Sequence, residues 1–126
     1  MTDTLTPAAR LVQRLIKAAP THREKIAMQA LADEHTILDS DAVRRVLVVE
    51  KSSRVTADWE GVSRQVYTLG LDELQRQFLE LVLSIAGFGR ISLASVEDFD
   101  ERQLLIVQRA LLALAGSDRI AIGTRL

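Results

Sequence analysis

The stretch from Leu71 to Gly123 constrains the fold most, because it uses one arrangement twice: an apolar helix followed by a short β-prone segment. Asp72 and Asp100 each stand three residues before a glutamine, the spacing of a capping box at a helix start. Each predicted helix then ends at an Ala-Gly pair, which favours a left-handed cap. The segments that follow, RISL at 90–93 and RIAI at 119–122, alternate apolar positions. We therefore expect two helices, each followed by a strand, and we expect the strands to pair.

The two predicted helices differ in their outer faces. The first carries one apolar stripe opposed by polar residues, which is typical of a helix that lies on a core. On the second, at about 100° per residue, the arc bounded by polar side chains also contains Leu105 and Leu112. These apolar side chains are expected to be shielded from water by another part of the chain or by a partner. Either the helix is central and packed by the N-terminal half, or its outer face is an oligomer or partner surface.

The composition is that of one globular domain. The 126 residues are 48% hydrophobic and 26% charged, which is enough apolar side chain for a core and does not indicate disorder. We expect a single domain over 1–126, with N-terminal helices in 1–69 and the helix–strand unit in 70–126. The absence of cysteine excludes disulfides and thiolate chemistry. No apolar run is long enough to span a membrane, and we expect a cytoplasmic protein.

Helix signals also organise the N-terminal half. Pro7 and Pro20 bound a first helix, and a capping box from Thr21 to Glu24 opens a second that runs to about Glu34. The remaining interpretations are a loop at 35–41, a helix at about 42–50, a linker at 51–54 and a helix at 55–69, or one bent helix from Asp41 to Leu69. The run 46–49 is ambiguous between strand and helix. The predicted class is mainly α with one short β pairing.

The segment 31–47 resembles a plain helix-turn-helix. Leu31 to Glu34 would close its first helix, Ile37 would lie in the turn, and Val43 to Leu47 would form its second helix. Two packed amphipathic helices explain the same pattern. The second helix carries Arg44 and Arg45, which we predict, together with Lys51 and Arg54, as a second basic contact to DNA.

The C-terminal pattern resembles a larger family. Its parts, in order, are a helix that ends at Gly87, a strand at Arg90–Leu93, a small helix at Ala94–Phe99, a helix at Asp100–Ala115 and a strand at Arg119–Gly123. Over about residues 78–122 this order is similar to the winged helix-turn-helix superfamily. The resemblance implies a winged-helix-like C-terminal half, a recognition helix at 100–115, a wing strand at 119–123 and double-stranded DNA as the partner.

The resemblance also implies which side chains would touch DNA. Arg102 and Gln103, at the start of the recognition helix, would read base edges, whereas phosphates would be met by Arg90, Ser95, Arg119 and Arg125. Together with the second basic contact from Arg44 and Arg45, this describes a small DNA-binding regulator, expected to be a homodimer.

A second interpretation uses the same fold without nucleic acid. Residues 70–126 contain six Lys or Arg and eight Asp or Glu, so the predicted DNA-reading part is net negative, whereas phosphate binding needs a clustered positive face. Leu105 and Leu112 interrupt the polar arc of the helix. Both observations favour a helical protein–protein interaction module, which would be an adaptor, an inhibitor or an assembly subunit.

No catalytic or metal chemistry is indicated. His22 and His35 are too isolated to predict a metal site, and the acidic run at 97–101 lacks the spacing of a calcium loop. The chain has no phosphate-binding glycine loop and no nucleophile elbow. We therefore expect a non-enzymatic protein with no cofactor and no metal.

Overall fold

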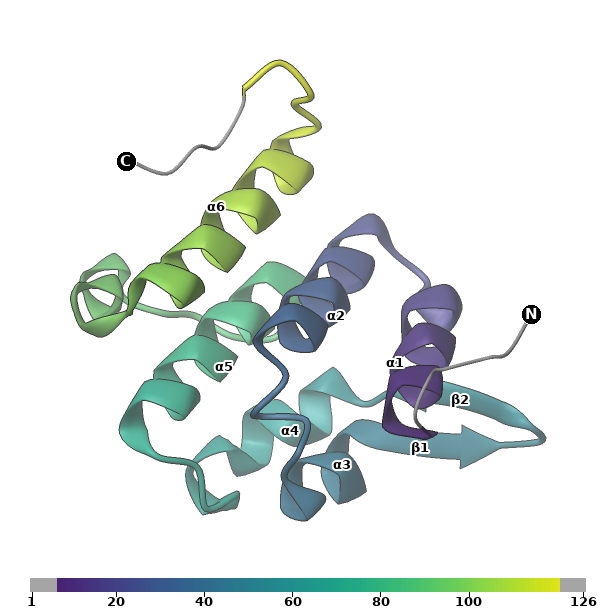
Figure 1. Ribbon diagram of the computed structural model, residues 1–126. Coiled ribbons are helices and arrows are strands. Elements are labelled where there is room, and N and C mark those ends of the chain that lie inside the picture. The colour runs from purple at the N-terminus through teal and green to yellow at the C-terminus, as the bar shows by residue number, and fades with distance from the viewer. Residues whose placement is uncertain (1–6, 121–126) are drawn as a thin grey trace.

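The structure, a computed structural model, describes residues 7–120 and is mainly α-helical (Figure 1). The elements are α1 (Pro7–Ala18), α2 (His22–Glu34), α3 (Asp41–Leu47), β1 (Val48–Lys51), β2 (Arg54–Ala57), α4 (Trp59–Gln65), the 3-10 helix η1 (Val66–Thr68), α5 (Glu73–Ala86), the 3-10 helix η2 (Leu93–Asp98) and α6 (Glu101–Ala115). The predicted class, mainly α with one short β pairing, is confirmed.

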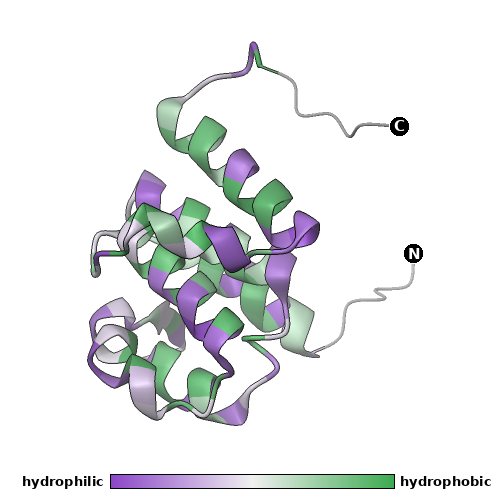
Figure 2. Ribbon diagram, turned by 90° about the vertical axis from the view of Figure 1, so that its left-hand side faces the viewer, coloured by the Kyte–Doolittle hydropathy of each residue, from purple (hydrophilic) through white to green (hydrophobic). Residues whose placement is uncertain are grey.

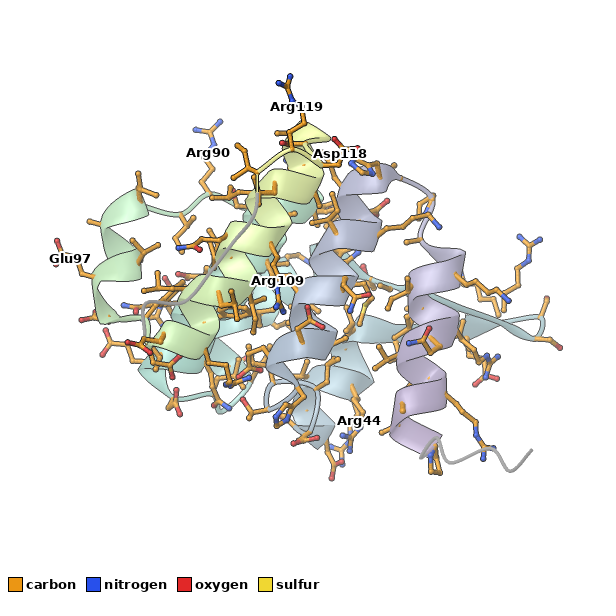
Figure 3. All side chains as sticks on the ribbon, turned by 45° about the horizontal axis from the view of Figure 1, so that its top comes forward. Arg44, Arg90, Glu97, Arg109, Asp118 and Arg119 are labelled. Carbon is orange, nitrogen blue, oxygen red and sulfur yellow. The ribbon has the colours of Figure 1, made fainter. Side chains whose placement is uncertain are left out.

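Helix α2 is the element around which the others pack. It contacts α1, α5 and α6, and it is buried on several sides at once. Ala27 and Ala30 are among its buried residues, and their small side chains let neighbouring helices approach closely. Figure 3 shows α6, α2 and α1 side by side in one layer, with η2 beside α6 at the left and other helices behind the layer.

The core lies between this layer and the elements behind it. Helix α5 contributes the apolar stripe expected from its sequence, with Phe78, Val82 and Ile85 buried. Leu47 from α3 and Trp59 from α4 close the core from the other side. The buried set therefore draws on every α-helix.

Helix termini follow the capping signals of the sequence. Of the three predicted capping boxes, those from Asp72 to Gln75 and from Asp100 to Gln103 are present. At the start of α2 the Thr21 hydroxyl accepts from the backbone N–H of Glu24, but the Glu24 carboxylate accepts from that hydroxyl in place of the Thr21 backbone N–H. Gly87 and Gly116 are left-handed, with φ of 97° and 69°. In this conformation their N–H groups reach the last helical carbonyls, and glycine adopts it without a steric cost.

Side chains at the start of α2 tie the ends of the three long helices together. Arg23, near the start of α2, donates to the carbonyl oxygen of Ile85 at 2.8 Å and to that of Ser84 at 2.9 Å, at the end of α5. His22 Nε2 donates to the Ala113 carbonyl oxygen at 3.0 Å, near the end of α6. Carbonyls in the last turn of a helix have no intrahelical donor; those of Ser84 and Ala113 accept from the cap glycines as well as from these side chains, and the helix dipole favours the positive charge of Arg23 there. The start of α2 is therefore fastened to the ends of α5 and α6.

The β pairing lies in a different place from the predicted one. Strands β1 and β2 form an antiparallel hairpin, and the segment 51–54, predicted as a linker, is its turn. The prediction of a strand at Arg90–Leu93 was wrong: 90–92 has no ladder partner in the part of the chain that the structure describes, and Leu93 begins η2. The predicted wing strand Arg119–Gly123 falls largely outside the described residues, and its first two residues are not in a strand.

The hairpin turn can be stabilised by substitution. Ser52 and Ser53 have φ of 50° and 69°, the double left-handed geometry that two-residue hairpins usually reach with Asn-Gly. We expect S52N/S53G to raise the free energy of unfolding by about 1 kcal/mol, because asparagine tolerates this conformation better than serine and glycine adopts it freely. Urea denaturation followed by Trp59 fluorescence measures the change. In a control, Ser92→Gly at φ −72° should give no stabilisation, and an equal gain there would contradict the argument.

Candidate functional site

The predicted DNA-reading residue Gln103 is not available at the surface. Its side chain is 3% exposed, and its amide oxygen accepts a hydrogen bond from the backbone N–H of Asp100 at 3.2 Å. This bond closes the capping box at the start of α6. The prediction that Gln103 contacts a base edge therefore disagrees with the structure, because the amide is already used inside the molecule.

Arg102 lies on the outside of α6 but is also engaged. Its Nη1 donates to the Glu34 carbonyl oxygen at 2.9 Å, and its Nη2 lies 3.4 Å from the Glu34 carboxylate. The side chain remains 46% exposed. Arg102 therefore fastens the start of α6 to the end of α2, which complements the contact between His22 and the end of α6.

The residues predicted to face phosphates are not gathered into one patch. Arg90 and Arg119 are exposed and point outward at the same end of the molecule in Figure 3, whereas Arg44 lies at the opposite end. Arg44 donates to the Leu38 carbonyl oxygen at 2.7 Å and pairs with Asp41.

The other residues predicted to contact phosphates do not connect these two ends of the molecule. Arg45 is exposed on α3, Ser95 is partly buried in η2, and Arg125 lies outside the described residues. The structure thus places Arg90 and Arg119 at one end of the molecule, and Arg44 with its sequence neighbour Arg45 at the other.

The outer face of α6 is the apolar surface that the sequence pointed to. The helix buries Gln103, Ile106, Val107 and Ala110 on one side. Leu105 and Leu112 are partly buried on the other side, and neither packs against the core that the helices share. The helix lies at the edge of its layer and packs against the N-terminal half through α2, on the side away from these two leucines (Figure 1).

Leu105 and Leu112 belong to a regular seam along α6. The seam consists of Leu105, Gln108, Leu112 and Ala115, which follow one another at alternating spacings of three and four residues. This spacing keeps side chains on one line and is typical of helices that pair lengthwise. Arg109 and Leu112 also line a shallow hollow with Ala113, Ser117 and Ile120.

Other apolar side chains are exposed near this part of the chain. Large hydrophobic residues exposed in the described range are Tyr67, Phe88, Leu93, Leu111 and Ile120. Four of these five come from the segment that leads into, forms or follows α6. Figure 2 shows apolar residues along the ribbon of α6 at the top of the view. The exposed apolar surface is therefore concentrated around α6.

A separate cavity of about 410 Å³ lies between α1, α2 and the loop that leads to α3. Its apolar lining includes Leu11, Val12 and Leu15, and its polar lining includes Asp33 and His35. Among residues 7–120, no serine, threonine, lysine or cysteine lines it. Sequence reasoning missed this cavity, and the available signal was the group of small residues Ala8, Ala9 and Ala32, which leave space between the two helices.

Neither a metal site nor a membrane span is present in the described part of the chain. Residues 7–120 contain no group of three or more His, Cys, Asp or Glu side chains placed to hold a metal ion. None of the helices in this range is both long enough and apolar enough to cross a bilayer.

Comparison of the chain with models of known protein families, with curated proteins and with solved structures gives no match. The functional argument therefore rests on the surfaces and contacts described above.

Proposed function

We propose that the chain is a non-enzymatic helical interaction module that pairs with a second copy of itself through the outer face of α6. The observation that carries this proposal is the exposed part of Leu105 and Leu112, which lie seven residues apart on one line and outside the core. Two leucines at this spacing gain free energy when a second apolar helix covers them.

The seam is complementary to itself. When two copies of α6 lie antiparallel across a two-fold axis, Leu105 of each copy can face Leu112 of the other. The same register brings Gln108 next to Arg109, whose guanidinium can donate to the amide oxygen. Such an interface uses one patch on both subunits, which is how most dimers assemble. A cytoplasmic homodimeric adaptor or assembly subunit fits this arrangement.

The pairing is expected to be of moderate strength. A helix of 15 residues is about 22 Å long, so α6 alone offers less surface than a standard interface. We expect a dissociation constant in the micromolar range, measured by sedimentation velocity over a concentration series.

Replacing both leucines with glutamate tests the proposal. In L105E/L112E, pairing would bury four carboxylates, so we expect the dimer to weaken by at least about 100-fold while the helical circular dichroism stays unchanged. The matched control is L93E/L111E, which places the same charges on two exposed leucines outside the seam. This control should still dimerise. A monomeric wild-type chain, or equal losses in both variants, would contradict the proposal.

DNA binding by the C-terminal half remains a second candidate. It is supported by the exposure of Arg90 and Arg119 at one end of the molecule (Figure 3). It has less support than pairing, because Gln103 is buried in the capping box and Arg102 is hydrogen-bonded to Glu34. A variant that lacks Arg90 and Arg119, used below, tests it directly.

A further inference from the structure

Positive charge is concentrated on α1 and the β-hairpin. Helix α1 has no acidic residue, and its three cations stand at i, i+4 and i+7, on one face. Together α1 and the hairpin contain five cations and one acid, Glu50, which is net +4 in a chain of net −1. We call the five cations the basic surface: Arg10, Arg14, Lys17, Lys51 and Arg54. All five are exposed.

The fold joins the two halves of the basic surface. Helix α1 packs against β2, as Figure 1 shows. Nη2 of Arg14 lies 3.4 Å from the carbonyl oxygen of Ser53, in the hairpin turn. Cations that are about 40 residues apart in sequence therefore lie on one side of the molecule.

Two features of the hairpin tip destabilise it. Lys51 and Arg54 are directly paired across the strands, and like charges in this position repel. Between them, Ser52 and Ser53 hold left-handed conformations that cost free energy for residues other than glycine. An anion bound at the tip would neutralise the repulsion and could accept hydrogen bonds from the serine hydroxyls. The tip thus points to an anionic ligand independently of the net charge.

The basic surface lacks apolar residues for insertion into a lipid bilayer. Leu15 is 2% exposed, and Leu11 and Ile16 pack against the core, so the apolar side of α1 faces inward. None of the large exposed hydrophobic residues in the described range belongs to α1 or the hairpin. Binding to membrane surfaces by amphipathic helices uses an apolar face turned toward the lipid. The surface fits a purely electrostatic ligand better.

We propose that the basic surface binds the phosphate backbone of duplex DNA without reading its sequence. The cations of α1 span about 10 Å along the helix, and a duplex presents one negative charge per about 1.7 Å of its axis. Several phosphates therefore come within reach of Arg14, Lys17, Lys51 and Arg54 at once. This site is separate from the α6 seam and does not depend on pairing.

Fluorescence anisotropy of a labelled 20-base-pair duplex of random sequence tests the proposal with the full chain. We expect binding at 50 mM salt. If three or four phosphates are neutralised, raising the salt to 200 mM weakens binding by about 40- to 150-fold. The variant K51Q/R54Q should lose about tenfold or more in affinity at 50 mM salt, and its salt dependence should fall by about two phosphate equivalents. R14Q/K17Q should behave similarly and serves if the first variant does not fold.

The matched control is R90Q/R119Q, which removes the same charge from two other exposed arginines. Its affinity should stay within about twofold of the wild type. Loss of affinity in this control with none in K51Q/R54Q would place binding on the C-terminal half and overturn the proposal. No binding by the wild-type chain at 50 mM salt would overturn it too, as would binding to phosphatidylserine vesicles without binding to the duplex.

Discussion

Replacing Glu34 with alanine is expected to lower the free energy of unfolding by about 3 kcal/mol, because several donors lose their acceptor. Glu34 is 2% exposed. Its carboxylate accepts from the backbone N–H of Ile37 at 2.8 Å, from Nη2 of Arg102 at 3.4 Å and from the hydroxyl of Thr36. These bonds hold the loop after α2 and the start of α6. Urea denaturation followed by the fluorescence of Trp59, which is 2% exposed, measures the loss.

The neighbouring acid provides the control for Glu34. Asp33 is exposed, and its carboxylate accepts a hydrogen bond from Gln29 at 2.9 Å. Asp33→Ala should change the free energy of unfolding by no more than about 0.5 kcal/mol, as surface substitutions usually do. Glu34→Gln keeps the shape and one acceptor and should fall between the two. If E34A proves as stable as D33A, the carboxylate does not organise this loop.

Local signals in the sequence predicted the helix ends well. Capping boxes and Ala-Gly endings depend on hydrogen bonds between residues three to five positions apart, so the sequence contains all their partners. The same locality could have prevented the error at Gln103. The sequence placed this residue at the third position of a capping box, where the side chain folds back onto the helix start and is not turned toward a partner.

The position of the β pairing could not be predicted in the same way. The segments 90–93 and 119–122 alternate as strands do, whereas 48–57 could be a strand or a helix. Strand formation depends on which backbone groups find partners in the tertiary structure, more than on intrinsic preference. The central place of α2 was hidden for a related reason, since alanine-rich faces look only weakly apolar in sequence and yet bury well between helices.

The two candidate surfaces differ in how far they could be predicted from the sequence. The outer leucines of α6 were visible in the sequence, because a helical periodicity defines a face without tertiary information. The basic surface was not visible as a unit. Its cations belong to a helix and a hairpin that are far apart in the chain, and only the packing of α1 on β2 brings them together.

Replacing Phe78 with alanine is expected to cost about 4 kcal/mol, since a large aromatic side chain leaves a fully enclosed site. Phe78 is 0% exposed, and its ring centroid lies 5.8 Å from that of Phe99. Phe99 comes directly before Asp100, the cap of α6, so the ring pair fastens the start of α6 to α5. Chemical denaturation measures the loss. Phe88→Ala is the control: this ring is 39% exposed, and we expect about 1 kcal/mol or less.

The Phe78 variant also distinguishes two ways in which pairing can fail. If α6 dimerises through its outer face, F78A should weaken the dimer only to the extent that it unfolds the chain. Phe78 lies in the core, where α5 meets the start of α6, and not on the outer face of α6. L105E/L112E should weaken the dimer while the midpoint of urea denaturation, measured on the monomer, stays near that of the wild type. A dimer lost in F78A at urea concentrations where the fold is still intact would mean that pairing depends on how α6 is held, and not on the leucine seam alone.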